Sequence, residues 1–307
     1  MSRELLDAGA VSHGEALGLM ARRIVEGYRV GEHRSPFHGF AIEFAQHREY
    51  APGDDMRHLD WKVLGRSDKY FIKQYEQDTN LVVHLVVDGS ASMNYGSSPA
   101  AGSDDAQEAV SKLHYAKILT ACLAYVVLQQ RDAVALALVD SELREYLRRS
   151  DNMQRLPLFL DRLAAFTGSK ETKLGDALDQ VAAAAGRRGI VVVLSDGFDD
   201  EAALVRGLEK LSFLGHEVVF FHVLDPFELT FPFDGTWRFQ DLESSDELQT
   251  TPADFRAAYL ENFSAFCQRL RTACERLHAH YVLCDTSRSV AETLSGYLAL
   301  RQSLKRK

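Results

Sequence analysis

Short apolar runs alternate with longer amphipathic segments from residue 81 to the end of the chain. Four of these runs are rich in β-branched or aromatic residues and have the length of a strand: residues 81–87, 133–139, 190–194 and 217–224. Such runs are typical of strands that are buried on both faces of a parallel sheet. Apolar residues at helical spacing predict helices over residues 109–130, 154–166, 176–185, 201–214, 254–277 and 290–304. Short strands are expected at residues 143–147, at a sheet edge, and at residues 281–283.

Repeated alternation of strand and helix predicts the fold class. We expect an α/β fold, with a doubly wound, mostly parallel sheet that carries helices on both faces, together with an N-terminal extension. The predicted organisation is an N-terminal part, residues 1–79, followed by one domain, residues 80–307, with an insertion at about residues 225–252. The insertion is acidic and aromatic, so a partner-binding surface and a solvated loop are equally good interpretations.

The first 80 residues lack the alternating pattern. Residues 11–28 have apolar positions at helical spacing, which predicts an amphipathic helix that packs on the main domain. Residues 31–80 are dense in charged, aromatic and glycine residues, and residues 70–75 alternate like a strand. A flexible linker does not carry so many large aromatic side chains. We therefore expect a small ordered subdomain here, with Trp61 as one of its anchors.

Composition and charge narrow the class of protein. The chain has 307 residues, of which 46% are hydrophobic and 26% charged, as in ordinary globular proteins. The net charge of −9 gives no basic field for nucleic acid. No apolar run is long enough to cross a bilayer, and no signal core is apparent. The four cysteines are scattered, which favours reduced thiols in a cytoplasmic protein.

Hard oxygen donors follow or precede the predicted elements at three places. Asp88, Ser90 and Ser92 come directly after the first buried run, Thr172 precedes a predicted helix, and Asp196 ends the third run. These positions can meet at the carboxyl edge of a doubly wound sheet, which is where ligands bind in such folds. Carboxylate and hydroxyl oxygens suit Mg²⁺ or Mn²⁺ better than soft metals.

The same three motifs resemble those of the von Willebrand factor type A (vWA) domain. They are D-x-S-x-S at residues 88–92, a threonine ahead of G-x-A-L at residues 172–178, and S-D-G at residues 195–197. The resemblance implies a metal-ion-dependent adhesion site. Ser90 and Ser92 would bind the metal directly, and Thr172 directly or through water. Asp88 and Asp196 would hold ordered waters, and one position would stay open for a partner's carboxylate.

A second resemblance covers nearly the whole chain. The upstream segment is similar to the bacterial "domain of unknown function 58" family, and the matching residues are Gly31, His33, Arg34, Ser35, Phe44, Arg48, Glu49, Tyr50, Gly53, Asp54, Asp55, Arg57, Asp60, Trp61, Lys62 and Lys73. This resemblance implies a partnership with MoxR-type AAA+ ATPases in the assembly or maturation of other proteins. Arg34, Arg48, Arg57 and Trp61 are candidates for partner binding, although ion pairs with neighbouring acidic residues would also explain the three arginines.

Three hypotheses follow. The first is a non-enzymatic, metal-dependent module that binds an acidic side chain of an AAA+ ATPase or of a client protein. The second is a metal-dependent phosphohydrolase with Asp88 as the nucleophile, but the second carboxylate that such enzymes place two residues later is replaced by Ser90. The third is a scaffold whose site holds no metal. Nucleotide-binding glycine motifs are absent from the sequence.

Overall fold

The computed structural model describes residues 13–29, 43–50, 61, 63, 65, 70–76, 81–97, 110–168, 173–186, 188–240 and 247–305. Contacts divide the chain into two compact units, one formed by Met1–Pro36 with Val82–Lys307 and the other by Phe37–Leu81. Helix α1 (His13–Arg29) belongs to the larger unit. The division into an N-terminal part, residues 1–79, and a domain, residues 80–307, stays a prediction.

A sheet of six strands, in the part of the chain that the structure describes, forms the centre of the larger unit. Its order is β10-β7-β6-β3-β4-β5. The strands are β3 (Val82–Asp88), β4 (Ala133–Val139), β5 (Leu143–Ser150), β6 (Ile190–Ser195), β7 (Glu217–Leu224) and β10 (His280–Asp285). Neighbouring strands are parallel except for β5, which is antiparallel to β4 at the edge. The predicted fold class, a doubly wound and mostly parallel sheet, is confirmed.

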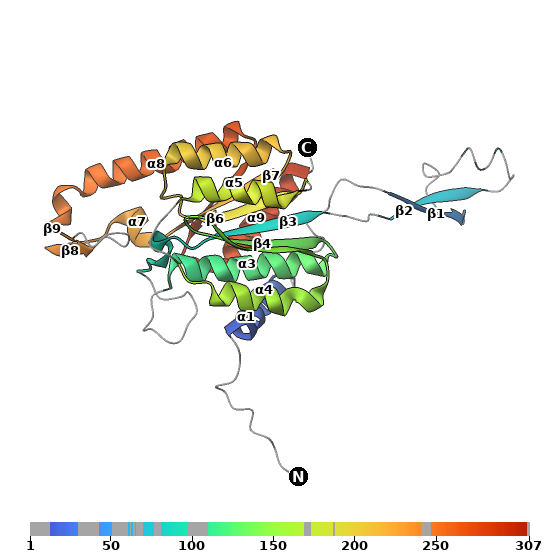
Figure 1. Ribbon diagram of the computed structural model, residues 1–307, viewed down its shortest axis with the longest axis horizontal. Coiled ribbons are helices and arrows are strands. Elements are labelled where there is room, and N and C mark those ends of the chain that lie inside the picture. The colour runs from blue at the N-terminus through green and yellow to red at the C-terminus, as the bar shows by residue number, and fades with distance from the viewer. Residues whose placement is uncertain are drawn as a thin grey trace, which may run out of the picture. The chain divides into compact units, whose positions relative to one another are not determined.

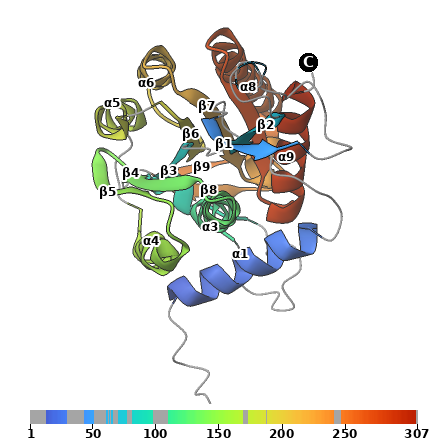
Figure 2. The same cartoon turned by 90° about the vertical axis from the view of Figure 1, so that its right-hand side faces the viewer.

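Helices cover both faces of this sheet (Figure 1). Helices α5 (Leu174–Ala185), α6 (Glu201–Phe213) and α8 (Arg256–Arg276) lie on one face. Helices α3 (Lys112–Gln129), α4 (Leu156–Ala165) and α9 (Val290–Lys305) lie on the other (Figure 2). Helix α1 packs outside α3 and α4 as a further layer, through the buried Leu17, Ala21 and Val25. The expected packing of this amphipathic helix on the main domain is therefore observed.

Strand pleating explains why the central runs are apolar at every position. On β7, Phe220 joins the core that α5, α6 and α8 cover, together with Val193 and Leu270. The next residue, Phe221, meets Tyr297 of α9 at a ring-centroid distance of 5.0 Å. Because successive side chains point to opposite faces, a strand covered on both sides needs apolar residues throughout. The pattern that predicted the sheet is thus a direct consequence of its two helical layers.

The smaller unit contains an antiparallel strand pair. Strands β1 (Glu43–Glu49) and β2 (Phe71–Glu76) are paired with one register irregularity between Phe44 and Gln46. Beyond the pair, the Tyr50 backbone N–H donates to the Tyr70 carbonyl at 2.9 Å. The strand expected at residues 70–75 corresponds to β2.

The order in which the chain adds strands to the sheet reverses between β3 and β6, although these two strands are parallel. From β3 the chain runs outward to β4 and β5, returns to β6 on the other side of β3, and continues outward to β7 and β10. In open α/β sheets such a reversal leaves a crevice at the carboxyl ends of the two central strands, because their following loops diverge. Asp88 ends β3 and Ser195 ends β6, so both lie at this crevice.

The insertion that follows β7 is structured where it is described. Its elements are the short helix α7 (Pro226–Thr230) and the antiparallel strands β8 (Trp237–Gln240) and β9 (Glu247–Thr250). Phe231 lies at the centre of an aromatic cluster, with Tyr259 of α8 at a centroid distance of 4.3 Å and Phe233 at 5.0 Å. Most of residues 232–240 are exposed, but aromatic packing against α8 and the β8–β9 pairing give this segment a regular structure, so it is more than a loop. The interpretation as a partner-binding surface stays a prediction.

Candidate functional site

The carboxylate of Asp88 is buried at the end of β3 and both of its oxygens are engaged. Oδ1 accepts the backbone N–H of Ser90 at 2.8 Å. Oδ2 accepts the hydroxyl of Ser195, at the end of β6, at 2.6 Å. Asp88 therefore ties together the two strands that flank the crevice and fixes the direction of the loop after β3.

The two serine hydroxyls of this loop face each other. Ser90 precedes a short 3₁₀ turn, η2 (Ala91–Asn94), and its Oγ lies 3.1 Å from Oγ of Ser92. Ser90 is buried and Ser92 is half-buried, so Ser92 is the more accessible of the pair. Hydroxyls this close can contact one common ion or water.

Glycines allow the neighbouring loop to approach this turn. A Cβ on Gly89 would come within 2.4 Å of the Phe166 ring, and a Cβ on Gly168 within 2.6 Å of the Gly89 carbonyl oxygen. Real Cβ atoms do not come so close to backbone, so larger residues here would force the loops apart. The loop after α4 therefore lies directly against Gly89 and Ser90.

Asp196 follows β6 and is also buried with both oxygens engaged. Oδ1 accepts the backbone N–H of Phe198 at 3.1 Å, and Oδ2 accepts the ammonium of Lys112 at 2.8 Å. The Asp196 carbonyl accepts Nε2–H of His222 at 2.7 Å, and Tyr281 O–H donates to Nδ1 of the same ring at 2.7 Å. Burial lowers the pKa of His222 to about 4, so the ring is neutral and this arrangement of donors fits one tautomer.

The charges of the site are strongly coupled. Burial, together with the nearby negative charge of Asp196, raises the pKa of Asp88 to about 7. Burial alone would lower the pKa of Lys112, but the charges of Asp196 and Glu228 outweigh it and raise that pKa above its ordinary value. The charge of Asp196 disfavours the ionised form of Asp88, and a cation placed nearby would relieve that repulsion.

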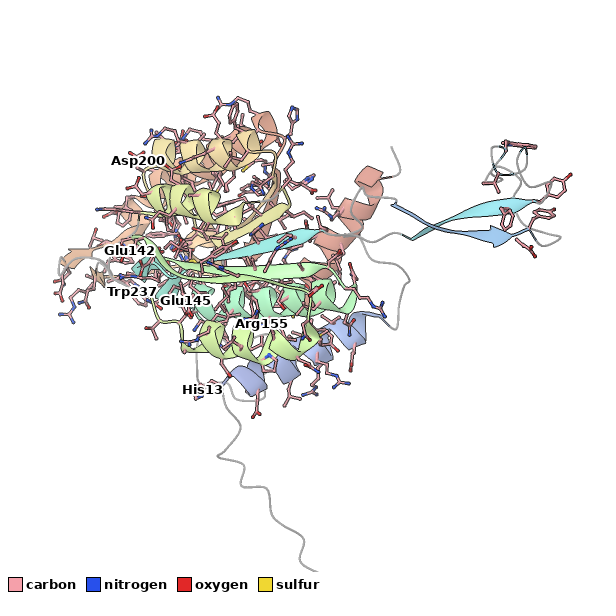
Figure 3. All side chains as sticks on the ribbon, turned by 45° about the vertical axis from the view of Figure 1, so that its right-hand side comes forward. His13, Glu142, Glu145, Arg155, Asp200 and Trp237 are labelled. Carbon is pink, nitrogen blue, oxygen red and sulfur yellow. The ribbon has the colours of Figure 1, made fainter. Side chains whose placement is uncertain are left out.

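Four of the five predicted metal ligands come together at the crevice: Asp88, Ser90, Ser92 and Asp196. Thr172 lies outside the described residues. The helix that follows it, α5, begins at Leu174. The backbone N–H of Gly175 donates to Asp199 at 3.0 Å, which ties the start of α5 to the loop after β6. Asp200 is the N-cap of α6, since its side chain accepts the Ala203 N–H at 2.7 Å (Figure 3).

The candidates for partner binding belong to the smaller unit. Arg34 and Arg57 lie outside the described residues, and Arg48 lies in strand β1. Trp61 is 64% exposed. Their role in partner binding stays a prediction.

The sequence analysis missed Ser195, Lys112 and Glu228. Ser195 lies in the S-D-G motif, but its bond to Asp88 depends on how β3 and β6 pair. Lys112 carried a signal that could have been used. It stands three, four and seven residues before Tyr115, Ala116 and Leu119, which all lie on the buried side of α3. A lysine on a buried helix face needs a carboxylate partner.

A cavity of about 480 Å³ opens beside the site at the carboxyl end of β4. Phe166 and Gly168 form one wall, and Leu138 and Asp140 form another. Arg144 and Arg162 lie at its rim with exposed side chains, each close to an acidic residue. This cavity gives a side chain from another molecule room to enter next to the Ser90 loop.

The donor set fits a hard divalent cation. The hydroxyls of Ser90 and Ser92 and the carboxylates of Asp88 and Asp196 are oxygen donors of the kind that Mg²⁺ and Mn²⁺ prefer. Among the described residues there is no cluster of three or more histidine, cysteine, aspartate or glutamate side chains that could hold a metal. A metal here would therefore depend on serine hydroxyls and water in addition to the acidic residues.

Two further predictions concern thiols and membranes. Cys122, Cys267, Cys274 and Cys284 are all free thiols, as expected from the scattered spacing. Within the described residues, no helix combines the length and apolarity needed to cross a bilayer.

The chain is similar to uncharacterised proteins in sequence and to several solved structures in fold. The uncharacterised proteins Rv1480 of Mycobacterium tuberculosis and Mb1516 of Mycobacterium bovis are each 27% identical to this chain over 231 residues, which cover 74% of this chain and 69% of theirs. Among solved structures, the conserved hypothetical protein BatB from Bacteroides thetaiotaomicron is similar over 73% of this chain and 99% of its own, with 15% identity and a TM-score of 0.44. The vWA domain of SpRpn10 is similar over 70% of this chain and 93% of its own, with 14% identity and a TM-score of 0.40.

A family model identifies the group to which the chain belongs. The model described as "Protein of unknown function DUF58" matches residues 46–266, which is well over half of the chain. The match includes the second half of β1, all of β2, the Asp88 loop and Asp196, so it extends over parts of both compact units. The resemblance seen in the upstream motifs is confirmed, and this chain is a member of the DUF58 family.

Proposed function

We propose that this protein is a divalent-metal-dependent binding module for other proteins. The observation that carries the proposal is the meeting of two adjacent serine hydroxyls with two buried carboxylates at the point where the sheet reverses. The carboxylate oxygens of Asp88 and Asp196 already accept hydrogen bonds from their own fold. The hydroxyls of Ser90 and Ser92 bond to each other, and each oxygen keeps a lone pair with which to bind a metal.

Each residue has a separate part in this proposal. Ser90 and Ser92 would bind Mg²⁺ or Mn²⁺ through Oγ. Thr172 would be a further ligand, as the resemblance to the vWA motifs implies. Asp88 and Asp196 would supply negative charge at the crevice while their hydrogen bonds keep them in place. A bound divalent cation supplies an electrophilic centre for an oxygen anion. A metal that is only partly neutralised favours an acidic side chain of the partner as its last ligand.

The partner that we propose is an acidic surface of a MoxR-type AAA+ ATPase or of its client protein. The choice of ATPase rests on the family resemblance, and the acidic chemistry rests on the site. The cavity beside the Ser90 loop leaves room for an incoming side chain. Its arginines are paired with acids of the same rim, Arg144 with Asp140 and Arg162 with Glu145, so the preference for an acidic partner rests on the metal. The cytoplasmic location expected from the sequence belongs to the same proposal.

The alternative, a phosphohydrolase with Asp88 as the nucleophile, is less well supported. A nucleophilic carboxylate must present a free oxygen to the phosphorus atom. Both oxygens of Asp88 accept hydrogen bonds from within the fold, and the side chain is buried. Metal-dependent turnover of generic phosphate esters that is lost in Asp88→Asn would favour this enzyme instead.

Capture of the partner tests the proposal. The purified chain is mixed with the AAA+ ATPase from the same genome, and capture is measured in Mg²⁺ and in chelator. We expect capture in Mg²⁺ alone, and its loss when Ser90→Ala is combined with Ser92→Ala. Equal capture by this double variant, with its fold intact, would remove the site from the interaction.

A matched control lies at the edge of the same sheet. Ser287 stands two residues after Asp285 at the end of β10, and it bonds to that aspartate through its backbone N–H at 2.9 Å and its hydroxyl at 2.6 Å. Ser287→Ala therefore changes the same local D-x-S turn away from the reversal between β3 and β6. We expect this variant to capture the partner like the wild type.

A further inference from the structure

A fully buried ammonium lies beside the proposed metal site. Lys112 is in the first turn of α3, and its side chain has no exposed surface. Nζ lies 2.8 Å from Oδ2 of Asp196 and also contacts Oε1 of Glu228. The ring of Phe198 is 4.9 Å from the same nitrogen, which adds an aromatic face to the two carboxylates. The cation is therefore held from three sides.

Glu228 is fixed on α7 independently of Lys112. Its Oε2 accepts the backbone N–H of Asp225 at 2.8 Å as part of a capping box. The Asp225 side chain in turn accepts the Phe227 N–H at 2.8 Å and the Ser97 N–H at 2.8 Å. Because other bonds hold Glu228, it can keep Lys112 even when Lys112 has no contact with Asp196.

The ammonium and a divalent metal need the same carboxylate. Asp196 is one of the two acidic residues that supply negative charge to the proposed metal site, and its Oδ2 is bonded to Lys112. While that bond is made, the charge of Asp196 is largely neutralised, so the metal would be attracted less. A divalent cation placed near Asp196 would also repel the ammonium.

We propose that Lys112 is an internal cation that competes with the divalent metal for Asp196, and that Glu228, which already contacts the ammonium, holds it alone when the metal binds. The inference rests on the proposed function and deepens it, since it assigns control of metal affinity to a lysine and a glutamate that do not touch the metal. Both are positioning residues. The site then has two states, one in which the ammonium bonds to Asp196 and one in which the metal takes its place beside that carboxylate.

The competition predicts opposite shifts in metal affinity for two substitutions. Lys112→Met removes the competitor, so we expect the Kd for Mg²⁺ to fall about tenfold. A cation a few ångströms from a carboxylate lowers its affinity for a proton by about tenfold or more, and it lowers the affinity for a divalent cation in the same direction. Glu228→Gln removes the alternative partner and leaves Lys112 with Asp196 alone, so we expect the Kd to rise. Titration calorimetry of the full chain with MgCl₂, and with MnCl₂, measures both values.

Two further variants separate competition from a general charge effect. Lys112→Met combined with Glu228→Gln keeps the net charge unchanged and removes the Lys112–Glu228 pair as a whole, so that the buried Asp196 alone loses its ammonium partner. We expect this variant to bind Mg²⁺ more tightly than the wild type. Lys117→Met is the matched control, because Lys117 lies on the same helix and its ammonium bonds to the carbonyls of Ala164 and Phe166. An equal shift in Lys117→Met, or none in the combined variant, would overturn the proposal.

The outcomes distinguish this inference from the proposed function. If the wild type binds Mg²⁺ and Lys112→Met binds it equally or more weakly, only the inference fails. If the wild type shows no heat and no thermal shift while Lys112→Met binds Mg²⁺, the inference holds and the metal dependence of the natural protein fails. If no variant binds either metal, both fail together.

Discussion

Asp88 and Glu217 are carboxylates whose pKa values shift in opposite directions. Asp88 is buried near another carboxylate, so its pKa rises to about 7. Glu217, at the start of β7, meets Arg301 and His280. Burial would raise the pKa of Glu217, but its hydrogen bonds with His280 and Arg301, and their charges, outweigh burial and lower that pKa to about 2. The immediate neighbours therefore decide the charge state of each acid.

Glu217 gives a prediction for stability against pH. Its pKa in the folded protein lies below the ordinary value, so its contribution is complete above about pH 5 and is lost as the pH falls toward 2. We expect Glu217→Gln to lower the free energy of unfolding at pH 7 by about 1–2 kcal/mol, allowing for solvent screening of a partly exposed group. The difference from the wild type should shrink between about pH 5 and pH 2. Chemical denaturation across this range measures it, and a difference that is constant with pH would contradict the assignment.

Individual site residues were predictable where the motif is local. Asp88, Ser90 and Ser92 lie within five residues, and Asp196 follows a recognisable strand, so spacing alone pointed to them. Lys112 and Glu228 are 116 residues apart and meet only in the folded chain. The helical period places Lys112 on a buried face of α3, but no local period identifies Glu228 as its partner. The pair that we propose to control the metal was therefore not predicted.

The close packing of helices α5 and α6 depends on glycine. A Cβ on Gly175 would lie 2.5 Å from the backbone carbonyl carbon of Ala203, and a Cβ on Gly207 would lie 2.9 Å from Cβ of Leu178. The two helices therefore approach each other more closely than larger residues would permit. This packing fixes the start of α5, at Leu174, against α6.

Gly175→Ala should separate these helices. We expect a loss of about 1–3 kcal/mol in the free energy of unfolding, because the added methyl meets backbone that cannot rotate away. Gly296→Ala is the control, since Gly296 is an exposed position of α9 with no atom within 4 Å of the added Cβ. It should be neutral or stabilise by up to about 1 kcal/mol through helix propensity. Urea denaturation compares the two, and a Gly175→Ala protein as stable as the wild type would exclude close helix packing.

At the level of elements, the pattern predicted the buried strands closely and the insertion less well. Residues 133–139 and 217–224 were expected as strands and are observed with those bounds. The insertion has no regular period because its core is the aromatic cluster around Phe231, which Tyr259 of α8 completes. Structure that depends on a distant helix leaves no periodic signal in its own segment.

For the whole molecule, the reversal between β3 and β6 decides where ligands can bind. A metal held there contacts only the folded chain, so its binding must stabilise the fold. We expect Mg²⁺ at about 100 times its Kd to raise the free energy of unfolding by about 2.7 kcal/mol. Thermal unfolding with Mg²⁺ and with chelator measures the shift. The variant with both Ser90→Ala and Ser92→Ala should lose it, and an unchanged shift in that variant would place the metal elsewhere.

The sequence by itself determined the fold class, the positions of the central strands and the local D-x-S-x-S and S-D-G motifs. These features are encoded by hydrophobic period and short spacing, which depend on nearby residues alone. Tertiary structure decided which strands are neighbours, and so which distant side chains meet. The bond between Ser195 and Asp88 and the contacts of Lys112 with Asp196 and Glu228 exist only because the chain reverses beside β3. Buried charges take their partners from strand order, and strand order is a property of the whole chain.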